Sequence, residues 1–143
     1  MSGRGNSSSK PASRTVKALV SRAPLRSHKD LEAYQRSMEL LVHVHELCDT
    51  FPVDERRNLA KQMRQASEAI PTSIAEGFGH KLSEKEFKKY IKTAMASATQ
   101  MRTHLRVAGK LGFVEGEDLA KLTDGYDHIG PQLNRLMTNW KRY

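Results

Sequence analysis

The sequence has little of what secreted and membrane proteins depend on. Its single cysteine, Cys48, excludes an intramolecular disulfide and leaves no basis for a cysteine-built zinc site. No apolar run approaches the roughly 18 residues that a membrane-spanning helix needs. Residues 1–29 also lack the apolar core of a secretory signal. We therefore expect a cytoplasmic protein without a membrane partner.

Acidic residues are absent from the start of the chain. The formal charge is +8, and residues 1–29 carry seven basic side chains and no acid. This stretch is rich in Ser, Gly and Arg and has too few large apolar groups to offset the entropy lost on ordering. We expect residues 1–29 to be a disordered basic tail and residues 30–143 to be one folded domain.

The tail has two competing interpretations. It could be an electrostatic arm for nucleic acid, with Arg14, Lys17, Arg22 and Arg26 as contacts, or a solubilising extension. Charge alone does not choose between them.

Four segments after the tail have apolar residues spaced three and four apart, the period of an amphipathic helix. This pattern predicts helices over about 30–50, 54–76, 83–111 and 115–140. No segment has the alternation of a strand. Four amphipathic helices joined by short loops predict an all-α fold, an antiparallel up-down four-helix bundle.

Individual residues indicate where the helices begin, bend and end. Pro71 should bend the second helix without dividing it, and Gly77 and Gly79 should end it. Ser83, followed three residues later by Glu86, forms a capping box that opens the third helix.

The first helix has two neighbouring apolar stripes, so we expect it to pack against more than one helix. One stripe is Leu31, Tyr34, Met38, Leu41, His45 and Cys48, and the other is Leu40, Val44, Leu47 and Phe51.

Catalytic patterns are nearly absent. His43 and His45 are two residues apart on a helix, so their side chains diverge and cannot share a metal. We interpret His45 as a hydrogen-bonded structural residue and Cys48 as a small buried apolar one. A hydrolase using His45, Cys48 or Glu76 is the weaker alternative. We expect no enzyme activity, no metal and no cofactor.

The strongest signal outside the core is a basic face on the third helix. At 100° per residue, seven cations fall within an arc of about 140°, and the helix has only two acids, Glu84 and Glu86. The candidate phosphate contacts are Lys85, Lys88, Lys89, Lys92, Arg102, Arg106 and Lys110.

Two other interpretations of this face remain open. It could be a solvated helix surface, or it could meet the acidic first helix of another copy, where five acids oppose Arg36. Because the aromatic residues are needed in the core, we expect neither base stacking nor sequence-specific readout.

The middle of the chain carries a more specific pattern. Its members are Phe51-Pro52, Glu55, Leu59, Gln62-Met63-Arg64, Ala66, Ile70-Pro71 and Ile74-Ala75-Glu76-Gly77, followed by Glu86-Phe87, Ala94, Ser97, Leu105 and Leu111-Gly112. Over about residues 30–140 the chain resembles the four-helix-bundle family of proteins encoded in intervening sequences of bacterial large-subunit rRNA genes. It departs from the family pattern at Ala69, Ser73, Ala96, Gln100 and Arg102, and the last two make its third helix more basic.

The resemblance implies an antiparallel bundle that assembles as a ring, typically a homopentamer, without known catalytic activity. Relatives by fold are accessory proteins of diversity-generating retroelements, whose basic barrel binds a reverse transcriptase and nucleic acid. The hypothesis is therefore a non-catalytic homo-oligomer that binds RNA or a ribonucleoprotein through the third helix and the tail. The alternative is a protein-interaction scaffold or an accessory subunit of a retroelement reverse transcriptase.

Overall fold

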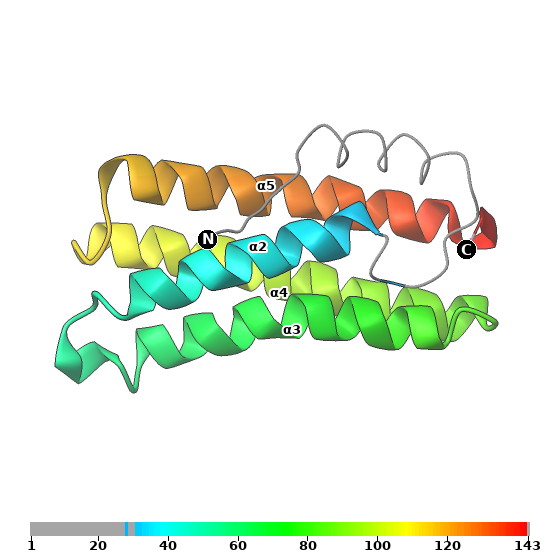
Figure 1. Cartoon of the computed structure of the whole chain (residues 1–143), viewed down its shortest axis with the longest axis horizontal. Helices are drawn as coiled ribbons and strands as arrows, with labels where there is room; N and C mark the ends of the chain where they lie inside the picture. Colours follow the sequence, from blue (N-terminus) through cyan, green and yellow to red (C-terminus); the bar gives the residue numbers. More distant parts are fainter. Residues whose placement is uncertain (1–27, 29–30, 143) are drawn as a thin grey trace, which may run out of the picture.

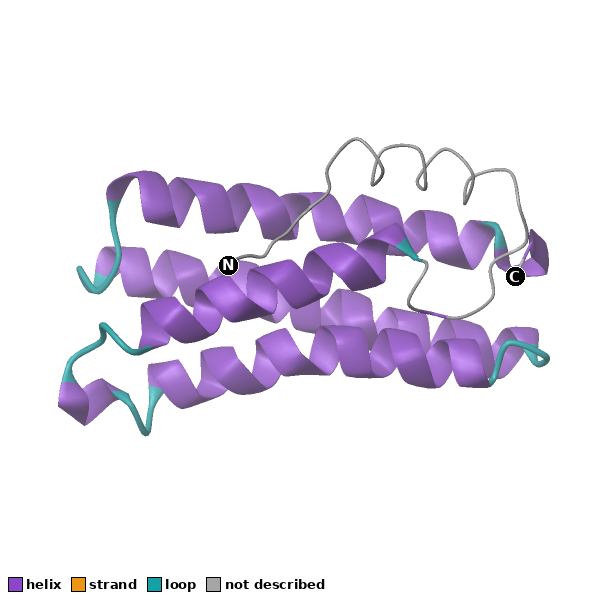
Figure 2. Ribbon diagram, in the orientation of Figure 1, coloured by secondary structure: helices purple, strands orange, loops and turns teal. Residues whose placement is uncertain are grey.

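The computed structural model describes His28 and residues 31–142. The expected disordered tail, including Arg14, Lys17, Arg22 and Arg26, lies outside the described residues. Within the described part, the elements are helices and loops without a strand (Figure 2). They are α2 (Glu32–Cys48), η3 (Val53–Glu55), α3 (Leu59–Gly79), α4 (Glu84–Lys110), α5 (Gly116–Thr138) and η4 (Trp140–Arg142), of which η3 and η4 are short 3-10 helices.

The four long helices run alternately in opposite directions and lie side by side (Figure 1). Each packs against its neighbours in the chain, and α5 returns to contact α2. Both α2 and α4 therefore touch α3 and α5, which encloses one core. This arrangement confirms the antiparallel four-helix bundle.

The core follows the apolar spacing of the sequence most closely on α4. The apolar residues spaced four and three apart along this helix are all buried, and they form a seam of Phe87, Ile91, Ala94, Ala98, Met101, Leu105 and Ala108. Each large side chain among them contributes roughly 1.5–3 kcal/mol on leaving water. Because this seam points inward, the opposite side of α4 faces solvent.

The second helix begins later than predicted. Residues 53–55 form η3, and Asn58, with φ −109° and ψ −104°, lies outside the helical region, so α3 starts at Leu59. Asn58 Nδ2 donates to the Asp54 carbonyl oxygen at 3.3 Å. Such local side-chain bonds compete with helix formation, and the prediction of a helix from Asp54 was wrong at this end.

Gly77 lies inside α3, which continues to Gly79 and runs through Pro71 as a single helix. A Cβ atom at Gly77 would lie 3.1 Å from the Cβ of Tyr90 and 3.4 Å from the carbonyl oxygen of Phe87. The prediction that Gly77 ends the helix was therefore wrong. This glycine instead allows α3 and α4 to approach closely.

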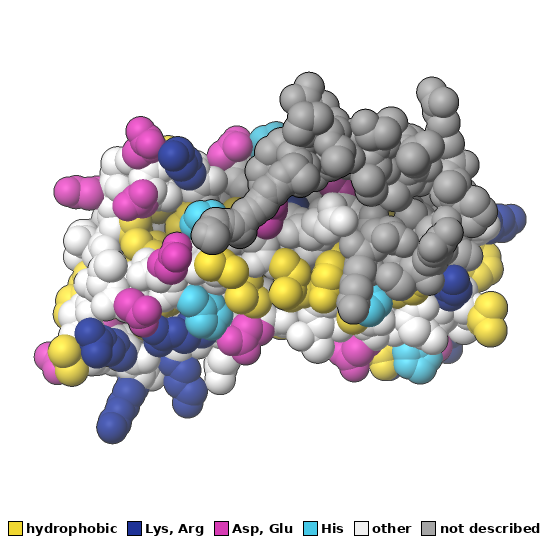
Figure 3. Space-filling model, viewed as in Figure 1, with side chains coloured by type: hydrophobic (Ala, Val, Ile, Leu, Met, Phe, Trp, Pro, Cys, Tyr) yellow, Lys and Arg dark blue, Asp and Glu magenta, His cyan; other side chains and the backbone are white. Residues whose placement is uncertain are grey.

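The first stripe predicted on α2 is only partly buried. The core side of α2 is centred on Leu40, Val44 and Cys48, whereas Met38 is 41% exposed. Val42, one turn further on, is 52% exposed. Apolar side chains consequently gather on the surface over α2 (Figure 3).

Candidate nucleic-acid interface

The candidate interface is built on α4, whose start is fixed by the predicted cap. Ser83 Oγ accepts a hydrogen bond from the backbone N–H of Glu86 at 3.3 Å. Glu84 and Glu86 lie in the first turn, where the helix dipole favours acidic side chains. The helix then continues for 27 residues without a proline or a break. At 1.5 Å per residue it presents a straight surface of about 40 Å.

The seven predicted basic residues lie on the surface of α4. Five are exposed, and Lys88 and Arg102 are half-buried. They form two groups, which we call the amino-end cluster (Lys85, Lys88, Lys89 and Lys92) and the carboxyl-end cluster (Arg102, Arg106 and Lys110). Ten residues, or about 15 Å of helix, separate Lys92 from Arg102.

Two of the seven cations have ion-pair partners in the described part of the chain. Lys88 Nζ lies 2.6 Å from Glu84 Oε2, and this hydrogen-bonded pairing lowers the pKa of Glu84. Arg102 Nη1 lies 3.8 Å from Asp127 Oδ1 on α5. The other five cations have no ion pair with a described residue, so most of the charge of the face is available to an external anion.

Aromatic rings lie beside the amino-end cluster, which the sequence had not indicated. His80 and Tyr90 stack with ring centroids 5.1 Å apart and an interplanar angle of 17°. Lys89 Nζ lies 5.7 Å from the centroid of the Tyr90 ring. Trp140 Nε1 donates to the Lys81 carbonyl oxygen at 2.7 Å, which ties the end of the chain to the α3–α4 turn. Only the fold brings these distant residues together.

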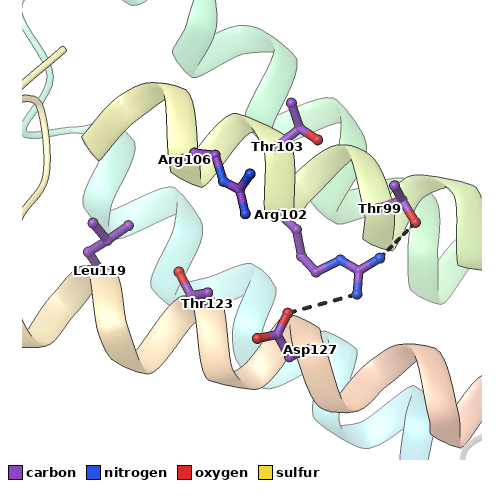
Figure 4. Close-up of a pocket in the computed structure, with 7 residues that line it drawn as sticks. All are labelled: Thr99, Arg102, Thr103, Arg106, Leu119, Thr123 and Asp127. Carbon is purple, nitrogen blue, oxygen red and sulfur yellow. Dashed lines mark hydrogen bonds and ion pairs between the residues drawn. The ribbon is translucent and has the colours of Figure 1, made fainter. Parts of the chain in front are cut away.

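A cleft of about 500 Å³ lies between α4 and α5 beside the carboxyl-end cluster. Arg102 and Arg106 project from α4 toward α5 across it (Figure 4). The complete lining is Thr99, Arg102, Thr103, Arg106, Leu119, Thr123 and Asp127. The sequence predicted the two arginines as surface contacts but gave no sign of the cleft, because its other wall comes from α5.

His45 and Cys48, two of the residues in the alternative hydrolase hypothesis, have different hydrogen-bond partners. The ring nitrogens of His45 lie 3.0 Å from the Leu41 carbonyl oxygen and 3.0 Å from Glu68 Oε2. Both partners are acceptors, so both hydrogen bonds form together only when the ring is doubly protonated. This geometry agrees with a hydrogen-bonded structural histidine.

Cys48 is fully buried, as predicted, and its thiol lies 3.6 Å from the Ala60 carbonyl oxygen. Burial raises the pKa of this thiol, which disfavours the thiolate that a nucleophile needs. Glu76 is exposed on α3.

The described residues include no group of three or more metal-ligating side chains placed to hold an ion. His43 lies 3.5 Å from Glu46, whereas His45 faces Glu68, so the two histidines diverge as predicted. Of the helices in the described part, none has the length and hydrophobicity required to cross a membrane.

Comparison with known proteins identifies a family and similar solved structures. Residues 29–135 match the family described as 23S rRNA-intervening sequence protein. A protein of unknown function from the S23 ribosomal protein family of Bacteroides thetaiotaomicron superposes with a TM-score of 0.66 at 18% sequence identity. The similarity covers 75% of this chain and 96% of that one. No curated protein is significantly similar in sequence.

Proposed function

Because this chain belongs to the family of 23S rRNA-intervening sequence proteins, we propose that it is a non-catalytic, homo-oligomeric module that binds RNA or a ribonucleoprotein. The observation that carries the proposal is the unneutralised charge of α4. Lys85, Lys92, Arg106 and Lys110 are exposed and unpaired among the described residues. Acids on α4 are confined to its first turn. A polyanion gains affinity at such a surface by releasing counterions.

The arrangement of charge favours contacts to the phosphate backbone over contacts to bases. Lysine and arginine side chains distributed along one helix position a nucleic acid without reading its sequence. The clusters are about 15 Å apart along α4, so an RNA would reach both only if it follows the helix. Tyr90 lies outside the buried core, contrary to the expectation that the aromatic residues are used there, and its stacked pair with His80 adds one place where an unpaired base could lie.

Charge reversal tests the amino-end cluster. The triple variant Lys88→Glu, Lys89→Glu, Lys92→Glu should bind a structured rRNA fragment more weakly. Its plot of log affinity against log salt concentration should also be shallower by about 2 to 3, the contribution of three phosphate contacts.

A matched variant separates this effect from total charge. Arg56→Glu, Arg57→Glu, Lys61→Glu makes the same charge change at three exposed residues before and within the start of α3. This control should retain more affinity than the α4 variant. If the wild type and the α4 variant bound RNA equally well, the assignment of the amino-end cluster as a phosphate-contacting surface would be wrong.

Self-association is the second part of the proposal. Met38 and Val42 present exposed apolar surface on α2. Acidic side chains lie beside apolar ones over this helix (Figure 3), and they would complement the basic face of another copy. Light scattering should give a mass several times that of one chain, and Met38→Lys with Val42→Lys should lower it. A monomeric wild type would contradict this part while leaving RNA binding testable.

The alternative is an accessory role toward a protein such as a reverse transcriptase. The basic face of α4 favours it as well, because a positive surface complements an acidic protein partner. Purified wild type that binds no RNA in low salt, but binds an acidic protein, would support this alternative.

A further inference from the structure

The cleft between α4 and α5 differs from the rest of the basic face because its cations share an open cleft with hydroxyl groups. Thr99, Thr103 and Thr123 line it together with two arginines. On the α5 side, Leu119, Thr123 and Asp127 recur every four residues, so they form one row along that helix. Leu119 and Asp127 stand at opposite ends of the row (Figure 4).

The two arginines are placed to act on one anion. Arg102 and Arg106 are four residues apart, so their side chains leave neighbouring positions on the same side of α4. Both extend into the space between the helices (Figure 4). A guanidinium group presents a planar set of donors that matches phosphate oxygens, and a pair of them favours a doubly contacted phosphate.

Arg102 is held in position without a strong partner for its charge. Its Nη2 donates to Thr99 Oγ1 at 3.1 Å, which directs the side chain into the cleft. Its Nη1 lies 3.8 Å from Asp127 Oδ1, beyond hydrogen-bond distance. Arg106 has no ion pair or hydrogen bond with a described residue. A phosphate would therefore gain two charge-assisted interactions and displace only one loose pairing.

The size of the cleft points to more than a bare phosphate. A volume of about 500 Å³ is within the usual range of small-ligand sites. Leu119 adds an apolar contact at one end, against which a sugar can pack. The cleft therefore has a charged part, a hydroxyl-lined part and an apolar part.

We propose that the α4–α5 cleft binds one nucleotide unit, with its phosphate held by Arg102 and Arg106 and its sugar beside Leu119. Thr103 and Thr123 supply hydroxyl contacts. The proposal rests on the proposed function only where the nucleotide belongs to an RNA chain, because a free nucleotide offers the same chemistry. Asp127 opposes the ligand, since its carboxylate attracts Arg102 and repels phosphate.

This opposition gives a test in which one substitution should strengthen binding. Uridine 5′-monophosphate is titrated into the full-length protein, with uridine as the phosphate-free probe, and backbone amide shifts are followed by NMR. Arg106→Gln should weaken nucleotide binding about fivefold or more, whereas Asp127→Asn should tighten it about threefold to tenfold. Uridine should produce no saturable shifts.

Matched controls make the same charge changes on α5 outside the cleft. Asp124→Asn removes an exposed acid one turn before Asp127, and Arg135→Gln removes an exposed arginine. Each should change nucleotide affinity less than twofold. The proposal is overturned if Asp127→Asn behaves like Asp124→Asn, or if uridine binds as well as its monophosphate.

The same variants with single-stranded RNA identify the source of the nucleotide. If RNA binds most tightly to Asp127→Asn, less tightly to the wild type and least tightly to Arg106→Gln, the result would place an RNA nucleotide in the cleft. Nucleotide binding in that order by a protein that binds no RNA would support a free-nucleotide site and refute the proposed function. If the protein binds RNA, but binds no nucleotide and shows no such order among the variants, the cleft is not a nucleotide site. The proposed function then still stands.

Discussion

Tyr126 is a fully buried residue whose hydroxyl has no hydrogen-bond partner among the described residues. Burial, and secondarily the nearby Cys48, raises the pKa of this phenol well above its ordinary value of 10. A buried hydroxyl without a partner costs roughly 1–3 kcal/mol.

We therefore predict that Tyr126→Phe increases the free energy of unfolding by about 1 kcal/mol, because it removes that cost and keeps the ring. Urea denaturation monitored by circular dichroism would measure the change. A loss of stability of similar size would show that the hydroxyl is satisfied in solution.

His104, half-buried on α4, gives the bundle a defined response to acid. Burial lowers the pKa of its imidazole below the ordinary value of 6.5, so the unfolded chain binds a proton more readily than the folded one. The contribution of the neutral imidazole to the free energy of unfolding is present above pH 6.5. It is lost as the pH falls through the lower pKa of the folded state. We predict that His104→Gln reduces the loss of stability between pH 7 and pH 5. A wild type and variant with the same loss, in parallel melts across this range, would contradict the prediction.

At the scale of helices, the α3–α4 contact depends on the absence of a side chain at Gly77. Alanine favours a helix over glycine by about 1 kcal/mol. At Gly77, however, its Cβ would press on Tyr90 Cβ at 3.1 Å and on Ile91 Cδ1 at 3.3 Å, and Tyr90 Cβ does not move without the helix. Overpacking of this kind costs about 1–3 kcal/mol.

We predict that Gly77→Ala lowers the free energy of unfolding by about 1 kcal/mol, the balance of these two effects. Gly79→Ala is the control, because no atom lies within 4 Å of a Cβ built there. It should leave stability unchanged or raise it slightly. If both variants gained stability in thermal melts, the close approach at Gly77 would not limit packing.

Features that depend only on residues within a single helix were predicted well from the sequence. The seam of α4 and the Ser83 cap follow from spacing within a single helix, and both are confirmed. The delayed start of α3 was missed because the Asn58 turn competes locally with a helix of good periodicity.

Features that need two helices could not be predicted. The role of Gly77 depends on how closely α4 approaches, and the cleft needs α5 opposite Arg102. The seven basic residues were identified from the sequence, but only packing shows that two of the arginines line a cleft. Their contact with nucleic acid stays a prediction.

At the scale of the whole molecule, charge is divided between α4 and α2, each of which packs against α3 and α5. The outer side of α4 is basic, while α2 carries three acids against one arginine. In the proposed function, this division would let copies attract one another and would let a polyanion follow the basic surface. Contacts between copies and contacts with a polyanion would compete for the same lysines. The salt dependence of RNA binding and the mass of the assembly must therefore be measured together.

The most direct test of RNA binding by the folded bundle is fluorescence anisotropy with a structured rRNA fragment. The full chain is compared with a shortened chain that begins at Asp30, at about 50 and 200 mM salt. We predict that the shortened chain still binds and loses affinity by about 10³-fold at the higher salt, as expected for several phosphate contacts. Binding that disappears with the tail, or is absent from both chains, would contradict the assignment of α4 as the nucleic-acid surface.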